Sequence, residues 1–170
     1  MKGGFPLFGH IGFSFTGLLF LVFLFIPNLL WLRRQPADAR PPKENRALLL
    51  MERGGQAATT ASLLLFRDYD PAGLQPRLIW YALAVVSMGL YLFCWARYFT
   101  GGQTMALFYG PLWFIPYPLA ALPVFAGLML GLYSRVGILF LSNILLGIGH
   151  IGIHMQHDQA RRKTQRRRLR

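Results

Sequence analysis

The sequence predicts an all-α membrane protein, a polytopic transmembrane helical bundle with five spans. Of its 170 residues, 54% are hydrophobic and only 14% are charged, and the mean hydropathy is +0.39. This composition does not suit a soluble domain. About 20 apolar residues are needed to cross a hydrocarbon core of about 30 Å. Four stretches are long enough, at 7–32, 78–98, 111–133 and 136–157.

A fifth segment, residues 47–66, decides the topology because it is mostly apolar but contains Glu52, Arg53 and Gln56. If it crosses the membrane, 13 basic residues lie on the inner side and 4 on the outer side. If it is instead a surface amphipathic helix, the protein has four spans and the 18 basic residues divide equally. Cytoplasmic loops collect Lys and Arg. We therefore expect five spans in a bacterial plasma membrane, with the N-terminus outside and the C-terminus in the cytoplasm.

The connections between these spans are short. The inner loop 33–46 is basic and contains three prolines, which prevent a continuous helix, whereas the outer loop 67–77 is rich in turn-forming residues. The other segments are an outer N-terminus at 1–6, an inner loop at 99–110, a hairpin at 134–135 and a basic tail at 158–170. In the fourth span, Pro116, Pro118 and Pro123 should bend or interrupt the helix.

Several polar residues fall at one depth near the inner side of the membrane. Counted at about 1.5 Å per residue from the inner ends, Glu52, His150 and Asn28 lie about 6–10 Å deep. A contact between Glu52 and His150 would satisfy an otherwise unpaired carboxylate, and a histidine changes charge near neutral pH. The predicted polar site comprises Glu52, Arg53, Gln56, His150, His154 and Asn28. The alternative is a structural clamp that only fixes the order of the helices.

No cofactor is the main expectation, but two alternatives follow from the histidines. His150 and His154 share a helical face, so they could bind a single metal ion together with Glu52. In the four-span topology, His10 and His154 lie on the same side and could ligate haem b. The single cysteine, Cys94, excludes an intramolecular disulfide and a multi-cysteine metal site.

The C-terminal tail predicts contact with anionic lipid headgroups. Basic clusters beside a span bind such headgroups at about 1 kcal/mol per residue. The tail contains seven basic residues, Arg161, Arg162, Lys163, Arg166, Arg167, Arg168 and Arg170. No aromatic residues that could stack on bases lie between them, so we expect no nucleic-acid binding. The expected partners are membrane lipids and, through small-residue helix faces, a second copy or another subunit of a membrane complex.

Residues 48–56 and 149–157 resemble stretches of small, uncharacterised bacterial multi-pass membrane proteins. This resemblance covers about 18 residues and implies no activity. The sequence leans against an enzyme, because it has neither a phosphate-binding Gly-Lys-Ser/Thr loop nor a Gly-x-Ser-x-Gly motif. We expect a binding or transport-related subunit for a small polar, ionic or lipid-headgroup ligand. The alternatives are a small haem or metal redox protein and a structural or assembly partner.

Overall fold

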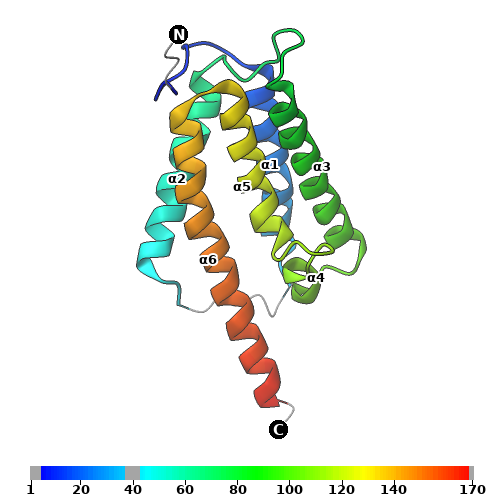
Figure 1. The fold of residues 1–170 in the computed structure, drawn as a ribbon. Helices are drawn as coiled ribbons and strands as arrows, with labels where there is room; N and C mark the ends of the chain where they lie inside the picture. Colours follow the sequence, from blue (N-terminus) through cyan, green and yellow to red (C-terminus); the bar gives the residue numbers. More distant parts are fainter. Residues whose placement is uncertain (1–4, 37–42, 169–170) are drawn as a thin grey trace.

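The computed structural model describes residues 5–36 and 43–168, except for the side chain of Arg168, and this part of the chain is all-helical, as predicted. It forms six helices and no strands (Figure 1). The helices are α1 (Phe15–Arg33), α2 (Arg46–Leu65), α3 (Leu78–Thr100), α4 (Met105–Tyr109), α5 (Pro118–Ser134) and α6 (Gly137–Arg168).

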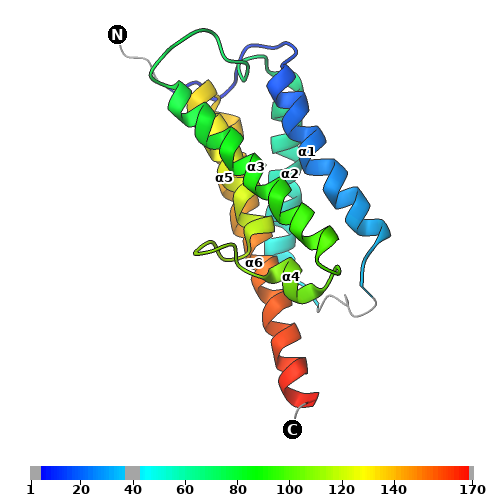
Figure 2. The ribbon, with the colours of Figure 1, turned by 90° about the vertical axis from the view of Figure 1, so that its right-hand side faces the viewer.

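The five long helices run alternately up and down and pack side by side. α2 packs on α6, α6 on α5 and α5 on α3, while α1 touches both α2 and α3. We call the end that carries α4 and the projecting part of α6 the tail end, and the opposite end the N-terminal end (Figure 1). α1 meets α2 at the N-terminal end and leans away from it toward the tail end (Figure 2).

Within the described residues, three helices are long and apolar enough to cross a membrane, fewer than the five predicted. They are Phe15–Arg33, Leu78–Thr100 and residues Gly137–Arg167 of α6. α5 is apolar but has only 17 residues, and the polar residues of α2 lower its mean hydropathy. Large apolar side chains such as Ile26 on α1 and Val86 on α3 point outward, each more than half exposed. Such surfaces suit contact with lipid.

The first and fourth predicted spans begin later in the structure than the hydropathy indicates. Residues 7–13 are not helical, because this segment crosses the end of α2, where Gly12 N–H donates to the Leu65 carbonyl at 3.0 Å. The fourth helix begins at Pro118 and not at residue 111. Pro116 and Pro118 limit helix formation before that point, and Tyr117 has a left-handed backbone with φ 48°. Pro123 lies inside the helix, as expected.

The last helix is longer than predicted. α6 continues through the basic segment to Arg168, so that its 32 residues extend about 48 Å. That length exceeds a hydrocarbon core of about 30 Å, and the charged end projects beyond the bundle (Figure 1). Residues 158–168 of the predicted tail are therefore helical.

Candidate functional site at the α2–α6 interface

α2 and α6 approach each other closely because glycines lie in their contact. A Cβ atom added at Gly55 of α2 would lie 2.5 Å from the backbone nitrogen of Leu146. A Cβ atom added at Gly149 of α6 would collide with the backbone of Glu52. Backbones can come this near only where no side chain intervenes. The close approach brings the polar side chains of the two helices within contact distance.

The central contact of this interface joins Glu52 to His150, as expected from their depth. Oε1 of Glu52 hydrogen-bonds Nδ1 of His150. The two side chains keep 20% and 28% of their surface exposed, so the pair can be reached by a small solute or by water. A carboxylate and an imidazole in contact can share a proton.

His154 lies one turn further along α6 and faces α4. Its ring centroid is 4.6 Å from that of His150, and it stacks on Phe108 at 5.4 Å with an interplanar angle of 19°. Tyr109 contacts it edge-on at 5.7 Å. Within the described residues, the buried Nδ1 of His154 has no hydrogen-bond partner. An imidazole nitrogen and two aromatic rings therefore lie beside His150 of the Glu52–His150 pair.

A second Glu–His pair lies closer to the tail end. His157 Nε2 is 3.1 Å from Glu44 Oε1, an ion-pair distance without hydrogen-bond geometry. Next to it, Asn45 N–H donates to Gln156 Oε1 at 3.3 Å. α2 and α6 are antiparallel, so the residue number rises on one side of the interface as it falls on the other. These pairs and Glu52–His150 therefore belong to a single register of the two segments.

The same register continues toward the N-terminal end with uncharged groups. The hydroxyls of Thr59 and Ser142 hydrogen-bond at 2.9 Å, and Asn143 Nδ2 donates to Thr59 Oγ1 at 3.3 Å. All three residues are buried. The interface thus carries polar groups at three levels, and only the two nearer the tail end hold ionisable side chains.

Three predicted site residues do not join this cluster. Arg53 and Gln56 are exposed on another face of α2, where they line an open groove of about 520 Å³ against Phe25 of α1. Asn28 is bound elsewhere, since its Nδ2 donates to the Leu24 carbonyl at 2.7 Å and to the Tyr91 hydroxyl at 2.9 Å. These three residues lie at a depth similar to that of Glu52 and His150, but their side chains point in other directions around their helix axes.

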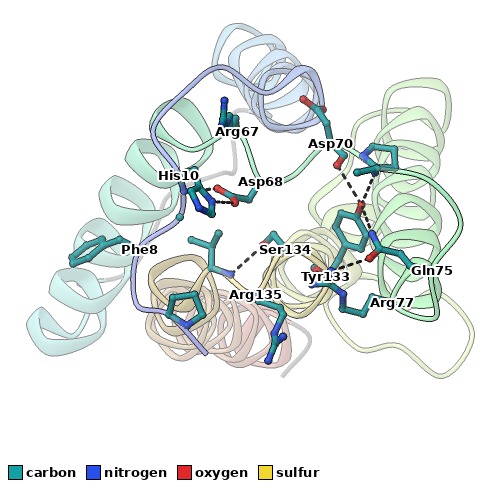
Figure 3. Close-up of a pocket in the computed structure, with 15 residues that line it drawn as sticks. Phe8, His10, Arg67, Asp68, Asp70, Gln75, Arg77, Tyr133, Ser134 and Arg135 are labelled. Atoms are coloured by element: carbon teal, nitrogen blue, oxygen red, sulfur yellow. Dashed lines mark hydrogen bonds and ion pairs between the residues drawn. The ribbon is translucent and has the colours of Figure 1, made fainter. Parts of the chain in front are cut away.

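The metal and haem alternatives find no support in this geometry. Across residues 5–36 and 43–168, no three His, Cys, Asp or Glu side chains are grouped so as to hold a metal ion. Glu52 meets His150 directly, whereas His154 packs on aromatic rings. His10 hydrogen-bonds Asp68 at 2.7 Å at the N-terminal end (Figure 3), whereas His154 stacks on Phe108 of α4 at the tail end. A haem held by His10 and His154 of one chain is therefore excluded.

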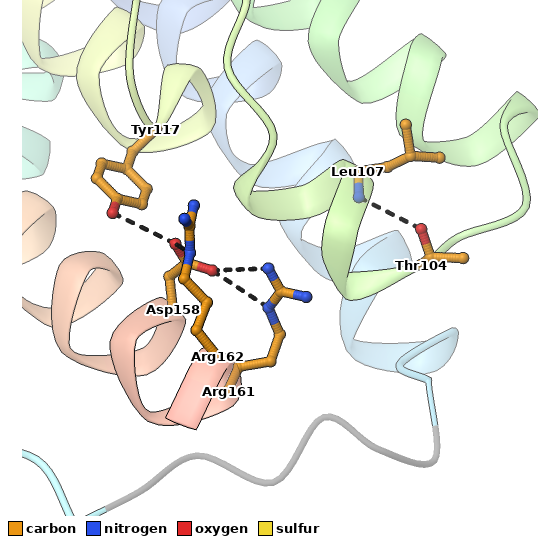
Figure 4. Close-up of polar contacts among 6 residues, drawn as sticks. All are labelled: Thr104, Leu107, Tyr117, Asp158, Arg161 and Arg162. Atoms are coloured by element: carbon orange, nitrogen blue, oxygen red, sulfur yellow. Dashed lines mark hydrogen bonds and ion pairs between the residues drawn. The ribbon is translucent and has the colours of Figure 1, made fainter. Parts of the chain in front are cut away.

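Asp158 was not among the predicted site residues. Its side chain is fully buried in the structure. Arg161 Nη2 donates to its carboxylate at 2.8 Å and Arg162 Nε at 2.7 Å, and the Tyr117 hydroxyl lies at 3.4 Å (Figure 4). Beside this cluster, Thr104 caps α4 by accepting from Leu107 N–H at 3.3 Å. The signal in the sequence was an acid three and four residues before two arginines, the spacing of helical ion pairs.

This cluster changes the expected lipid-binding surface of the tail. Arg161 and Arg162 direct their guanidinium groups at Asp158, so they are not free cations. Lys163, Arg166 and Arg167 are exposed and remain available. The side chain of Arg168 and the whole of Arg170 lie outside the described residues.

A second polar site, also not predicted, lies at the N-terminal end. An open cavity of about 830 Å³ is bordered by the loop before α1, the loop after α2 and the α5–α6 connection (Figure 3). The Tyr133 hydroxyl joins these parts by donating to the Asp70 carbonyl at 3.2 Å. Asp70 in turn accepts from the N–H groups of Thr16 and Phe15. Partial burial alone would raise the pKa of Asp70, but these hydrogen bonds hold the pKa below its usual value.

Comparisons with protein-family models, with curated proteins and with solved structures find no match. The arrangement of residues is therefore the basis for a functional proposal.

Proposed function

We propose that this protein is a small binding or transport-related membrane protein that binds a small ammonium-type cation in exchange for a proton at Glu52, His150 and His154. The observation that carries the proposal is the partly exposed Glu52–His150 contact. Beside it lies a buried nitrogen of His154 for which the described residues supply no hydrogen-bond partner. A protonated His150 pairs with the carboxylate, whereas a neutral His150 leaves that charge for another cation.

The surroundings of the pair suit such a ligand. Phe108 stacks on His154 and Tyr109 meets it edge-on, both within about 6 Å, so the imidazole is held in one orientation beside the Glu52–His150 pair. The His154 Nδ1 atom offers a hydrogen-bond acceptor to an ammonium N–H when the ring is neutral in that tautomer. Acid and histidine groups inside membrane proteins commonly mark ion, proton or substrate paths.

The proposal includes the five-span topology in a bacterial plasma membrane, with the tail end in the cytoplasm. Its support is that α2 and α5 lie antiparallel to the three candidate spans within one bundle (Figure 1). Single cysteines at Leu7 and Ala72 in a Cys94→Ala background test it in intact cells. Labelling of both by an impermeant thiol reagent is expected, and labelling of Ala72→Cys alone would indicate four spans.

Ligand binding is tested by thermal unfolding in lipid nanodiscs with ammonium, methylammonium and choline at pH 6 and pH 8. A ligand present at 100 times its Kd stabilises the folded state by about 2.7 kcal/mol. We expect stabilisation by at least one of these cations, greater at pH 8 than at pH 6 because fewer protons then compete with the cation for the site. Glu52→Gln should abolish the stabilisation, and His150→Ala should reduce its dependence on pH.

Glu44→Gln is the matched control, because it removes a Glu–His contact of the same kind nearer the helix end. It should retain ligand stabilisation. Stabilisation that persists in Glu52→Gln, or that no cation of the panel produces, would reject the proposed site.

A structural clamp is the second candidate, favoured by the constant register of polar pairs from Glu44–His157 to Thr59–Ser142. A clamp requires that Glu52→Gln lower the melting temperature without any ligand present. A binding site requires near-normal melting of the unliganded variant together with lost stabilisation by ligand.

A further inference from the structure

The face of α2 that points away from α6 borders a groove whose shape and charge fit a lipid. The groove has a volume of about 520 Å³ and is open along one side. It is lined by Phe25 of α1 and by Arg53, Gln56, Ala57, Thr60, Ala61 and Leu64 of α2. It exists because α1 touches α2 near the N-terminal end, at Gly17, and then leans away (Figure 2).

One end of this groove is cationic. The Arg53 side chain is exposed and makes no ion pair or hydrogen bond among the described residues. Arg46 lies seven residues earlier, two turns along the same face, and is also exposed. Glu52 of α2 and Glu44, which lies just before α2, are directed at histidines of α6 and do not neutralise this end.

Apart from Gln56 and Thr60, the rest of the groove is apolar, and it has the length of one lipid chain in a single leaflet. Arg53 and Leu64 are eleven residues apart, which corresponds to about 16 Å along a helix. Half of a hydrocarbon core of about 30 Å is about 15 Å. Ala57 and Ala61 provide the shallow floor, so a chain can lie against the helix with Phe25 as the opposite wall.

We propose that this groove binds one anionic phospholipid, with the phosphate at Arg53 and Arg46 and one acyl chain along Ala57, Ala61 and Leu64. A second copy of the chain suits the groove less well. A symmetric contact would bring Arg53 and Arg46 of both copies together with no acid on the groove face, and like charges repel. The inference requires only that the protein lies in a membrane and is independent of ligand binding at Glu52.

The test is native mass spectrometry of the full chain released from nanodiscs containing equal amounts of phosphatidylglycerol and phosphatidylcholine. We expect one retained phosphatidylglycerol molecule on the wild type. Arg53→Ala should weaken its retention about five-fold, the loss expected for one basic residue near a membrane surface. Ala61→Leu keeps every charge but fills the groove, and should also displace the lipid.

Two matched variants separate this site from general effects. Arg166→Ala removes an exposed cation from the tail, and Ala82→Leu enlarges an exposed alanine on α3. Both should retain the lipid as the wild type does. Equal retention in Arg53→Ala, Ala61→Leu and the two controls would overturn the proposal, as would a dimer whose formation depends on Ala61.

A second measurement needs no substitution and covers the case in which a variant does not fold. Wild-type protein is reconstituted with phosphatidylglycerol that carries a photoactivatable diazirine in one acyl chain. Cross-links are expected on residues 57–64 of α2 and near Phe25 of α1. Cross-links spread evenly over the exposed faces of α1, α3 and α6 would contradict a defined lipid site.

Discussion

The two faces of α2 differ in what they contact, although their residues alternate along one helix. The face toward α6 is packed at backbone distance through Gly55 and carries buried or paired polar groups. The face toward α1 borders an open groove and carries Arg53, which has no ion pair or hydrogen bond with the described residues. Neighbours in the sequence such as Glu52 and Arg53 therefore belong to different surfaces, since successive helical residues do not face the same way.

The largest expected difference between the faces concerns two adjacent glycines. Gly55→Ala places a methyl group against the Leu146 backbone, which cannot rotate away, so we expect a loss of about 2–3 kcal/mol in unfolding free energy. Gly54→Ala is the control, because its methyl group would lie 3.9 Å from the Leu145 side chain. Denaturation in detergent measures both, and equal stabilities would disprove close packing at Gly55.

A smaller difference is expected between two adjacent threonines. Thr59→Val removes the buried hydroxyl shared by Ser142 and Asn143, which should cost about 1 kcal/mol. Thr60→Val changes a side chain that lines the groove and should be nearly neutral. Chemical unfolding of the two variants checks this, and a larger loss for Thr60→Val would reverse the assignment of the faces.

The attachment of α1 to α2 should depend on pH at the N-terminal end. Asp70, in the loop after α2, caps the first turn of α1, and its pKa is lower in the folded chain than its ordinary 3.8. The ionised carboxylate thus stabilises the fold fully above the ordinary pKa, and that stability is lost as the pH falls through the lower, folded value.

Hydrogen exchange measures this effect at the start of α1. Faster exchange is expected at Thr16 and Gly17 near pH 3 than near pH 6, after correction for intrinsic rates. The start of α2 is an internal control, because Asn45 caps it without a titrating group. Asp70→Asn should remove most of the pH dependence, and unchanged dependence in that variant would show that another group is responsible.

The smallest expected effect is that of Arg53→Gln on stability. The exposed guanidinium has no protein partner among the described residues, so the unfolding free energy in detergent should change by less than about 0.5 kcal/mol. A large loss of unfolding free energy would mean that Arg53 stabilises the bundle itself, in contrast to the expected role in the groove alone.

The site was partly predictable because depth can be counted along a helix. Glu52 and His150 lie at one depth, and they meet. Asn28 was assigned to the same depth but faces Tyr91 of α3, and Arg53 faces the groove. Depth gives the height of a residue and not its direction around the axis, which depends on which helices are neighbours.

Some elements were mispredicted because hydropathy does not distinguish a span from an apolar loop. Trp113 and Phe114 lie in a loop at 75% and 87% exposure, within a segment assigned to a span. Conversely, the basic tail was expected to follow the last helix but continues it to Arg168. There the buried Asp158 accepts from two arginines of the same helix.

The sequence by itself determined the all-helical class, the apolar stretches that can cross a membrane, and the level at which its charged residues lie. These properties follow from composition and from the fixed rise of a helix. Only the tertiary structure decided that α2 packs on α6, because that choice depends on glycines matching a facing backbone across about 90 residues of chain. The same choice paired Glu52 with His150 and turned Arg53 toward a groove. Asp158 is buried by another tertiary contact, with Tyr117 before α5.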